Sequence, residues 1–563
     1  MKKLKQKLSF LLAISLMIAG LSACSGSQQG NEETSKKPVE SLGETPTDEG
    51  DDGIVNKTGF PIVDETLTQT VMISISSSWN VINDDLSTMY FFEEMAKKTN
   101  VKFDFEKLSN DQWSERLSLT FAGQNLPDIL IGEISNNDII TYANAKQLVA
   151  LNDLVSEYAP DYFEVLNQFP ESAKLYAPDG NMYGFAGTIT GGYAEVPGSR
   201  AFINTKWIND LGLEHPTTFD EFYEVLVAFR DNDPDGNGID DTIPLGGFSG
   251  GYAVDPFVAG PLGISFGWAP KDQWQEVDGR LVYVAEHPQY EKYLQNMNKL
   301  YKEGLLDQEY YTQNEAQYVA KGTNMQIGAT TAAAPFVLTN STDPEIYEQF
   351  DVIGPLTSDV FTEKVWYGQN VENPGIFITS ANENPEVTAR YFNEIYTEEG
   401  AWLLVGPEAG TWDGDEGGRV WNEDKTKYTY TFSDDHNGVY EYMNNVVAPL
   451  QAGMAGFRQF SEAMKSELMA PEDVVLLDSL KNNVEYMVPN APSLFFTIEE
   501  LEEIILIQDA IYTHLNQMEA KIVMGEESID KFSSLIDDLQ GMGLDQLTKI
   551  YNQAYDRYKE NVK

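Results

Sequence analysis

The alternation of strand-like runs with helical stretches constrains the fold of this chain more than any other feature. Residues 70–75 (TVMISI) are β-branched and apolar, residues 84–99 carry apolar side chains at helical spacing, and residues 101–108 alternate like a second strand. The pattern continues with a helical stretch at 113–122, an apolar run at 128–131 and a helical stretch at 137–148. Strands that alternate with helices predict an α/β lobe with a largely parallel sheet.

Similar signals recur further along the chain. Residues 200–204 predict a strand that leads into a helix at 205–211, and Thr218, with Glu221 close behind, predicts the start of another helix. Further strands are expected at 326–330 and 375–378, a helix at 387–400, and mostly helical structure from about 462. A chain of 563 residues is too long for one simple core, so two or more lobes are expected.

The N-terminal segment predicts export. Four lysines precede an apolar run at 8–21, which is shorter than the roughly 20 residues that a membrane span needs, so residues 1–23 are predicted to be a signal peptide. The segment Leu21-Ser22-Ala23-Cys24 resembles the bacterial lipobox, which implies cleavage before Cys24 and attachment of lipid, including palmitate, to its sulfur. The alternative is an ordinary signal peptide followed by an incidental cysteine. Because Cys24 is the only cysteine, the chain has no internal disulfide.

Composition narrows the environment and the partners. Residues 24–59 are polar and poor in apolar side chains, which predicts a disordered tether. The formal net charge of −52 argues against binding to nucleic acid or anionic lipid, because such binding needs basic patches. Aromatic residues make up 12% of the chain, enough to line a ligand groove.

Several segments resemble one protein family. They are residues 116–132 (RLSLTFAGQNLPDILIG), 179–185 (DGNMYGF), 202–222 (FINTKWINDLGLEHPTTFDEF) and 532–559 near the C-terminus. Together they resemble the bacterial extracellular solute-binding proteins of the carbohydrate ABC importer type. Within that family, the chain is most similar to the long Gram-positive lipoproteins related to alginate-binding proteins.

The resemblance implies a type II periplasmic-binding-protein fold, in which two discontinuous α/β lobes hold the ligand between them. We expect lobe one at 60–197 and 348–415, and lobe two at 198–347 and 416–563. The implied protein is a monomer, anchored by lipid on the outer side of the cell membrane of a Gram-positive bacterium. Its implied partners are a carbohydrate, two ABC permease subunits and, through them, a cytoplasmic ATPase.

The segment at 231–242 is the sharpest chemical motif. From Asp233 it reads D-x-D-x-N-G-x-x-D, which places oxygen ligands at alternate positions and a glycine at the sixth, as a Ca²⁺ loop requires. The predicted ligands are the side chains of Asp233, Asp235, Asn237 and Asp241 and the carbonyl of Ile239. Alginate-binding relatives carry a calcium loop of this spacing before an Ile-Pro pair, but they usually have glutamate where this chain has Thr242. The alternative is a solvated turn without metal.

A sugar-binding site combines flat aromatic rings with hydrogen-bonding side chains. Candidate residues of both kinds occur at strand ends, at the expected crossing between lobes and in glycine-rich or polar loops. For each aromatic ring among them, the alternative is core or surface packing. The predicted ligand-binding set is Trp79, Asn80, Tyr193, Arg200, Trp268, Trp366, Asn370, Trp412 and Asp413.

Enzyme functions are less well supported. Residues 247–251 match G-x-S-x-G around Ser249, but the flanking sequence predicts a loop, whereas a hydrolase elbow needs a strand and a helix. No catalytic residue is predicted. An oligosaccharide receptor is the leading hypothesis. A receptor for a peptide or polyol on the same fold and, less favoured, a cell-surface glycan hydrolase remain open.

Overall fold

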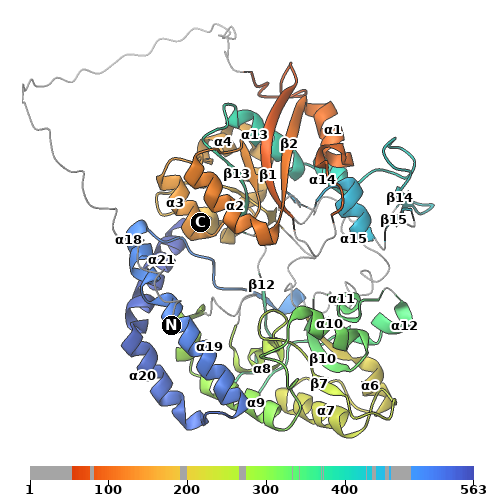
Figure 1. Cartoon of the computed structure of the whole chain (residues 1–563), viewed down its shortest axis with the longest axis vertical. Helices are drawn as coiled ribbons and strands as arrows, with labels where there is room; N and C mark the ends of the chain where they lie inside the picture. Colours follow the sequence, from red (N-terminus) through yellow and green to blue (C-terminus); the bar gives the residue numbers. More distant parts are fainter. Residues whose placement is uncertain are drawn as a thin grey trace, which may run out of the picture. The chain divides into compact units, whose positions relative to one another are not determined.

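The computed structural model describes residues 54–75, 81–189, 200–265, 274–332, 334–341, 343–368, 371, 373–425, 428–433, 436, 439–449, 456–457 and 484–562. They belong to one compact unit that begins at Ile54 and contains two larger sheets, each with helices packed on it (Figure 1). Within these residues, every helix is too short or too polar to cross a membrane.

The first sheet has the strand order β2-β1-β3-β13-β4. Its first three strands are parallel, as predicted, whereas β13 runs antiparallel to both β3 and β4. The difference arises because β13 comes from a later part of the chain, which re-enters the sheet at the edge where the first three strands end. The strands are β1 (Leu67–Ile75), β2 (Val101–Ser109), β3 (Ile129–Ile131), β4 (Phe185–Ala186) and β13 (Pro374–Ile378).

Alternating side chains of the first sheet enter two separate cores. Ile73 and Ile131 pack in one core with residues of α1, while Met72 and Leu130, one position away, pack in the other with residues of α2. This period of two is the pattern expected for a sheet covered on both faces. The helices of this lobe are α1 (Tyr90–Thr99), α2 (Asn110–Gly123), α3 (Asn136–Asn144), α4 (Asn152–Tyr158), α5 (Pro160–Leu166), α13 (Pro385–Asn393) and α14 (Glu398–Val405).

The second sheet has the order β11-β6-β10-β7. Strand β6 is antiparallel to β10 and β11, and β7 is parallel to β10. The predicted strand at 200–204 is confirmed without any shift in its bounds. The strands are β6 (Arg200–Asn204), β7 (Ile243–Leu245), β10 (Ile327–Ala332) and β11 (Phe350–Val352).

The helices of the second lobe begin where local signals place them. Thr218 and Glu221 form the expected reciprocal cap at the start of α7, with the Glu221 amide donating to Thr218 Oγ1 at 3.2 Å. The helices are α6 (Thr205–Asp210), α7 (Phe219–Asp231), α8 (Asp255–Val258), α9 (Tyr290–Lys302), α10 (Glu315–Thr323), α11 (Pro335–Thr339) and α12 (Pro344–Tyr347).

A C-terminal layer of four helices contacts both lobes (Figure 1). Helix α18 contacts α3, and Asn136 of α3 donates to the carbonyl of Leu494, just before α18, at 3.0 Å. Asn552 of α21 exchanges two hydrogen bonds with the backbone of Leu281 in the second lobe. The layer consists of α18 (Ile498–Ile505), α19 (Gln508–Met524), α20 (Phe532–Met542) and α21 (Leu544–Asn561). It confirms the predicted helical character of the described C-terminal residues.

Four two-stranded pairs complete the fold. They are β5 (Thr188–Ile189) with β16 (Gly456–Phe457), β8 (Trp274–Val277) with β9 (Arg280–Tyr283), β12 (Trp366–Gly368) with β17 (Met487–Pro489), and β14 (Gly418–Trp421) with β15 (Tyr428–Thr431).

Sheet and core membership differ from the expected lobe ranges at two places. Strand β11 pairs in the second sheet, although lobe one was expected to resume at 348. Tyr442, Met443 and Val447 pack in a core of the first sheet, although lobe two was expected to resume at 416. The reason in the second case is the β14–β15 hairpin, which is held to α14 where Tyr430 donates to the Val405 carbonyl at 2.6 Å. The other lobe boundaries stay predictions.

Candidate functional site

Strand directions define a common edge on the first sheet. Strands β1, β2 and β3 end there, and β13 begins there with Pro374 opposite Ala186. Ligands of open α/β folds bind beyond such strand ends. The exposed Glu133 follows β3 at this edge, and its carbonyl accepts a hydrogen bond from Trp113 Nε1 at 2.6 Å. The predicted residues Trp79 and Asn80 follow β1 in the sequence but lie outside the described residues.

The second sheet has a corresponding edge. Arg200, which begins β6, stands opposite Ala332, which ends β10. Strand β7 is parallel to β10 and ends on the same side of the sheet, with Leu245 opposite Ala329. The predicted ligand residue Arg200 is half-buried at this edge. Tyr193, which precedes it in the sequence, is outside the part of the chain that the structure describes. The segment that leaves β7 here is residues 246–254, which we call the β7 loop.

Hydrogen bonds from surrounding side chains hold the β7 loop. Gln313 Nε2 donates to the Gly247 carbonyl at 2.6 Å, Thr330 Oγ1 to the Gly246 carbonyl at 3.0 Å, and Thr331 Oγ1 to the Ala253 carbonyl at 2.9 Å. The Tyr310 carbonyl accepts the Ser249 amide at 3.0 Å. A loop fastened at so many points can present side chains at the strand ends in a fixed geometry.

Tyr252 in this loop is not in the predicted ligand-binding set. Its side chain is half-buried and its ring lies 5.5 Å from that of Tyr318 and 6.0 Å from that of Phe248. The only sequence signal is a Gly-Gly-Phe-Ser-Gly-Gly run after a short strand. The run lies in the loop between β7 and α8, as predicted for this segment.

Trp366 and Tyr367 lie in β12. Trp366 is only 8% exposed and belongs to a buried core, so packing accounts for its ring in this structure. The Tyr367 hydroxyl donates to the Gly263 carbonyl and accepts from Gln275 Nε2, both at 3.4 Å. Trp268 and Asn370, which are near these residues in the sequence, lie outside the described ranges.

Trp412 and Asp413 lie in the loop between α14 and β14. The Trp412 indole donates to Glu93 Oε2 at 3.1 Å and packs edge-on against Tyr90, both of α1. Asp413 is exposed. Trp412 therefore belongs with the first sheet and Arg200 with the second, so the predicted set is divided between the two lobes. Whether Trp412 and Asp413 touch ligand stays a prediction.

The acidic loop at 233–241 folds tightly on itself. Asp233, Gly236 and Gly238 have positive φ angles of 46°, 70° and 75°. The Asn237 side chain lies at the centre, where its Nδ2 donates to Asp235 Oδ2 at 2.6 Å and to Asp241 Oδ1 at 3.1 Å. Gln326 Nε2 ties Asp241 to the start of β10 at 2.8 Å. The loop thus gathers carboxylates around one amide group.

The donor set of this loop fits a hard cation, although its present arrangement is incomplete. Partial burial and then the neighbouring Asp233 and Asp241 carboxylates hold the pKa of Asp235 above its ordinary value, as expected for acids crowded without a cation. However, no three acidic, histidine or cysteine side chains converge as a metal cluster in the described residues. Turning the Asn237 amide, so that its oxygen replaces its nitrogen, would add an oxygen ligand at the centre.

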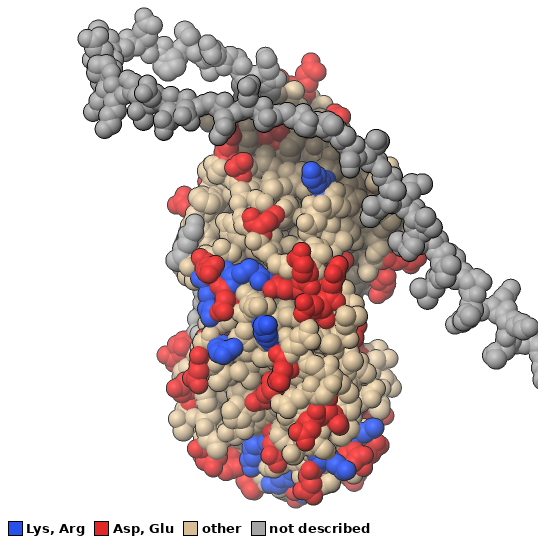
Figure 2. Space-filling model, turned by 90° about the vertical axis from the view of Figure 1, so that its left-hand side faces the viewer, with Lys and Arg blue, Asp and Glu red and all other residues tan. Residues whose placement is uncertain are grey.

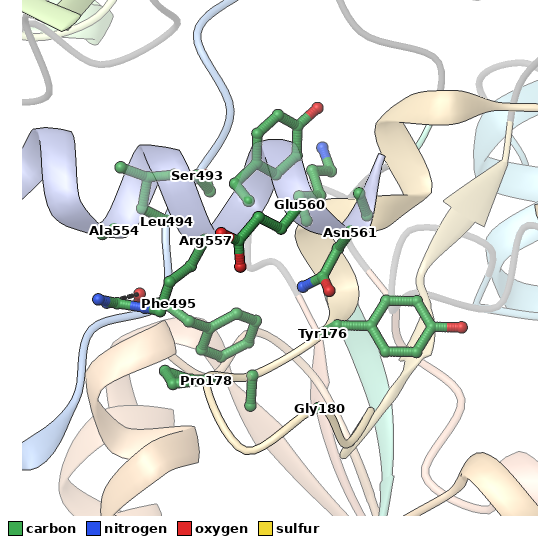
Figure 3. A pocket seen from close by; sticks show the side chains of 14 residues that line it. Tyr176, Pro178, Gly180, Ser493, Leu494, Phe495, Ala554, Arg557, Glu560 and Asn561 are labelled. Carbon is green, nitrogen blue, oxygen red and sulfur yellow. Dashed lines mark hydrogen bonds between the residues drawn. The ribbon is translucent and has the colours of Figure 1, made fainter. Parts of the chain in front are cut away.

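A separate groove lies where the end of α21 meets residues 173–180, and it is not at the strand-end edges (Figure 3). Tyr176, Phe495 and Asn561 line it together with Arg557. The Arg557 guanidinium is already bonded to both oxygens of Glu500, at 2.8 and 2.5 Å. The groove is therefore a junction of the C-terminal layer and the first lobe.

On the face drawn in Figure 2, acidic side chains are spread widely and basic ones gather at only a few places.

Comparison with curated proteins finds relatives along most of the chain. The fructooligosaccharide ABC transporter substrate-binding protein FusA of Streptococcus pneumoniae is 25% identical over 508 residues, 85% of this chain and 88% of FusA. The polygalacturonan/rhamnogalacturonan-binding protein YtcQ of Bacillus subtilis is 24% identical over 489 residues, 83% of this chain and 88% of YtcQ.

Solved structures share the fold. FusA in complex with kestose has a TM-score of 0.69 at 23% identity and covers 88% of this chain and 100% of its own, and an EF-hand mutant of FusA in complex with fructo-nystose matches equally. The alginate-binding protein AlgQ2 without calcium ion has a TM-score of 0.63 at 21% identity, covering 88% of this chain and 99% of its own. A family model described as bacterial extracellular solute-binding protein matches residues 79–402. Because this match spans more than half of the chain, the protein belongs to the bacterial extracellular solute-binding proteins.

Proposed function

We propose that this protein is the substrate-binding subunit of an ABC importer and that it captures an oligosaccharide. The observation that carries the proposal is the pair of strand-end edges, one on each sheet, in a chain of this family. The names of FusA and YtcQ support a saccharide as the ligand class. A peptide or polyol receptor on the same fold is the alternative, and we propose no enzymatic activity.

Ligand recognition would combine stacking with hydrogen bonding. Tyr252 and Tyr367 supply rings with hydroxyl groups, and Glu133 and Arg200 supply charged hydrogen-bonding groups at the two edges. Sugars expose an apolar ring face and a rim of hydroxyls, which this combination matches. Closure of the lobes around the ligand, the usual motion of such proteins, would bring the two edges against one molecule. The other predicted ligand residues remain part of this proposal.

A thermal-shift panel tests the ligand class. The purified protein is screened with fructo-oligosaccharides, galacturonan fragments, monosaccharides, peptides and polyols. A ligand that binds only the folded state adds about 2.7 kcal/mol of apparent stability at a hundredfold excess over Kd. We expect such a shift with one oligosaccharide class and unchanged ligand on chromatography. A shift with peptides alone would reject the saccharide assignment, and breakdown products would favour the hydrolase alternative.

We also propose that the loop at 233–241 binds Ca²⁺ with a structural role. Carboxylate and carbonyl oxygens are the ligands that Ca²⁺ prefers, and the loop supplies Asp233, Asp235, Asn237, Asp241 and the Ile239 carbonyl. The EF-hand mutant of FusA and the AlgQ2 structure without calcium ion support the proposal, because both relate calcium sites to proteins of this fold. Bound calcium would neutralise the crowded carboxylates and fix the connection between α7 and β7.

Calcium is expected to raise the unfolding midpoint of the wild-type protein and not that of Asp235→Ala. The reason is that Ca²⁺ bound only to the folded state stabilises it in proportion to occupancy, and Asp235 is a central ligand. Midpoints are measured in excess EGTA and in millimolar CaCl₂. Asp240→Asn is the matched control, because Asp240 is an exposed carboxylate of the same loop outside the predicted ligand set. Equal calcium shifts in Asp235→Ala and the wild type would refute the site.

The proposed anchor and partners follow from the family. We propose that lipid on Cys24 holds the protein at the outer membrane face, where it delivers ligand as a monomer to two permease subunits coupled to a cytoplasmic ATPase. Incorporation of labelled palmitate, abolished in Cys24→Ser, tests the anchor. Retention of the label in that variant would contradict it.

A further inference from the structure

Two carboxylates and four tyrosines lie together where the second lobe meets the C-terminal layer. Asp255 begins α8, Glu519 lies on α19, and both residues are half-buried. The four tyrosines are Tyr290 and Tyr293 of α9 and Tyr310 and Tyr311 of the segment that precedes α10. We call these six residues the acid–tyrosine cluster.

Phenol groups link the two acids to the helices around them. Tyr290 Oη donates to Glu519 Oε2 at 2.6 Å, and Tyr311 Oη donates to Glu519 Oε1 at 3.5 Å. Tyr293 Oη donates to Asp255 Oδ1 at 3.0 Å. Helix α9 is therefore bonded to both carboxylates, to Glu519 through Tyr290 and to Asp255 through Tyr293.

Among the described residues, the charged groups of the surrounding elements form no ion pair with these two acids. On α9, Lys299 lies over the Tyr223 ring at 3.4 Å, and Lys302 lies beside Gly525. On α19, His514 is 3.6 Å from Asp538, and Lys521 is exposed. Asp307 and Glu309, which precede Tyr310, pair with Lys321. Tyr283 and Tyr512 are further titratable groups near the cluster.

Burial shifts the titration of both acids. It raises the pKa of Asp255 to about 6, and burial, followed by the Asp255 charge, raises the pKa of Glu519 to about 7. Hydrogen bonds from Tyr293 and Tyr290 act in the opposite direction but are the smaller influence. Both acids therefore hold protons at a pH where an exposed carboxyl group has lost them.

The cluster also touches the β7 loop. Tyr310 accepts the Ser249 amide on its carbonyl at 3.0 Å, and its hydroxyl accepts the Val254 amide at 3.4 Å. Asp255 follows Val254 directly in the chain. We propose that the acid–tyrosine cluster is a proton-dependent latch, which fastens α19 of the C-terminal layer and the β7 loop to α9 when its acids are protonated.

The direction of the effect follows from the raised values. A carboxyl group whose pKa is higher in the folded than in the unfolded state stabilises the fold below its unfolded pKa. That contribution is lost as pH rises through the folded pKa, here between about 4.5 and 7. Above this range the cluster carries two negative charges, so α19 and the β7 loop are held less firmly.

Hydrogen exchange and thermal unfolding of the full chain at pH 5.5 and 8.0 test the latch. After correction for intrinsic exchange rates, we expect protection of residues 246–254 to fall about tenfold or more at pH 8.0. The unfolding midpoint should fall as well. In Glu519→Gln both differences should shrink, and this variant should be more stable than the wild type at pH 8.0 but not at pH 5.5.

Three further variants keep the test decisive. Asp255→Asn should flatten the same profiles, and it replaces Glu519→Gln if that variant does not fold. Glu526→Gln, an exposed residue just beyond α19, should leave them unchanged. Tyr310→Phe should uncouple the β7 loop from pH while the midpoint keeps its pH dependence. Wild-type pH profiles in both acid variants, or flattened midpoints with loop protection still pH-dependent, would overturn the proposal. None of these readouts requires a ligand, so they are independent of the proposed transport function.

Discussion

Lys321→Met is expected to destabilise the folded protein by about 3–5 kcal/mol, because it leaves a buried carboxylate without its cation. The Asp307 side chain is only 3% exposed, and Lys321 Nζ contacts its two oxygens at 2.9 and 2.8 Å. Gln313 also donates to Asp307, at 2.8 Å. Chemical denaturation of the variant and the wild type measures the difference in free energy of unfolding.

The matched control is Lys97→Met. Lys97 pairs with Glu94 at 2.7 Å, but their side chains are 63% and 32% exposed, so this variant should change stability by about 0.5 kcal/mol or less. The Lys321→Met substitution should also disturb the β7 loop at the proposed ligand edge, because Gln313 donates to both Asp307 and the Gly247 carbonyl. A loss below about 1 kcal/mol in Lys321→Met would mean that Asp307 is reached by water, and the buried-pair argument would then fail.

Local signals predicted much of this fold, and the split helix at 387–400 shows where they stop. Apolar spacing continues through the whole stretch, yet α13 ends at Asn393 and α14 begins at Glu398. Thr397 caps α14 by accepting the Gly400 amide at 3.0 Å. A side chain at Gly400 would place its Cβ 1.9 Å from the Glu394 carbonyl oxygen, so the break depends on a close backbone approach that periodicity does not encode.

The candidate site residues stay predictions, because their assignment depends on contacts between distant segments. Tryptophans stand out in a sequence, but Trp366 belongs to a core and Trp412 packs on α1. Tyr252 carries no such mark, because its place in the fold depends on strand register: β7 ends on the side of the second sheet where Arg200 begins β6. Strand β11 is likewise part of the second sheet because it pairs with β6, a distant segment of the chain. Contacts between distant segments are the part that one sequence does not reveal.

Tyr252→Ala is expected to weaken binding of the best oligosaccharide in the thermal-shift panel by about tenfold to a hundredfold, or about 1.4–2.8 kcal/mol. The half-buried ring lies in the β7 loop at the second edge, where it can cover the apolar face of a sugar. Tyr252→Phe keeps that ring and should lose less affinity. Isothermal titration calorimetry measures the three dissociation constants.

The control for Tyr252 must share its burial but not its position. Tyr223 is also half-buried and belongs to the second lobe, but it lies on α7, where its hydroxyl donates to Glu303 at 2.6 Å. Tyr223→Ala should therefore leave oligosaccharide affinity within about twofold of the wild type, since Tyr223 lies outside the β7 loop and its hydroxyl bonds to Glu303. Wild-type affinity in Tyr252→Ala would remove this residue from the ligand site. If Tyr252 contacts the sugar directly, its loss should weaken binding more than the loss of Tyr223. An equal loss of affinity in both alanine variants would show instead that binding depends on the general integrity of the second lobe.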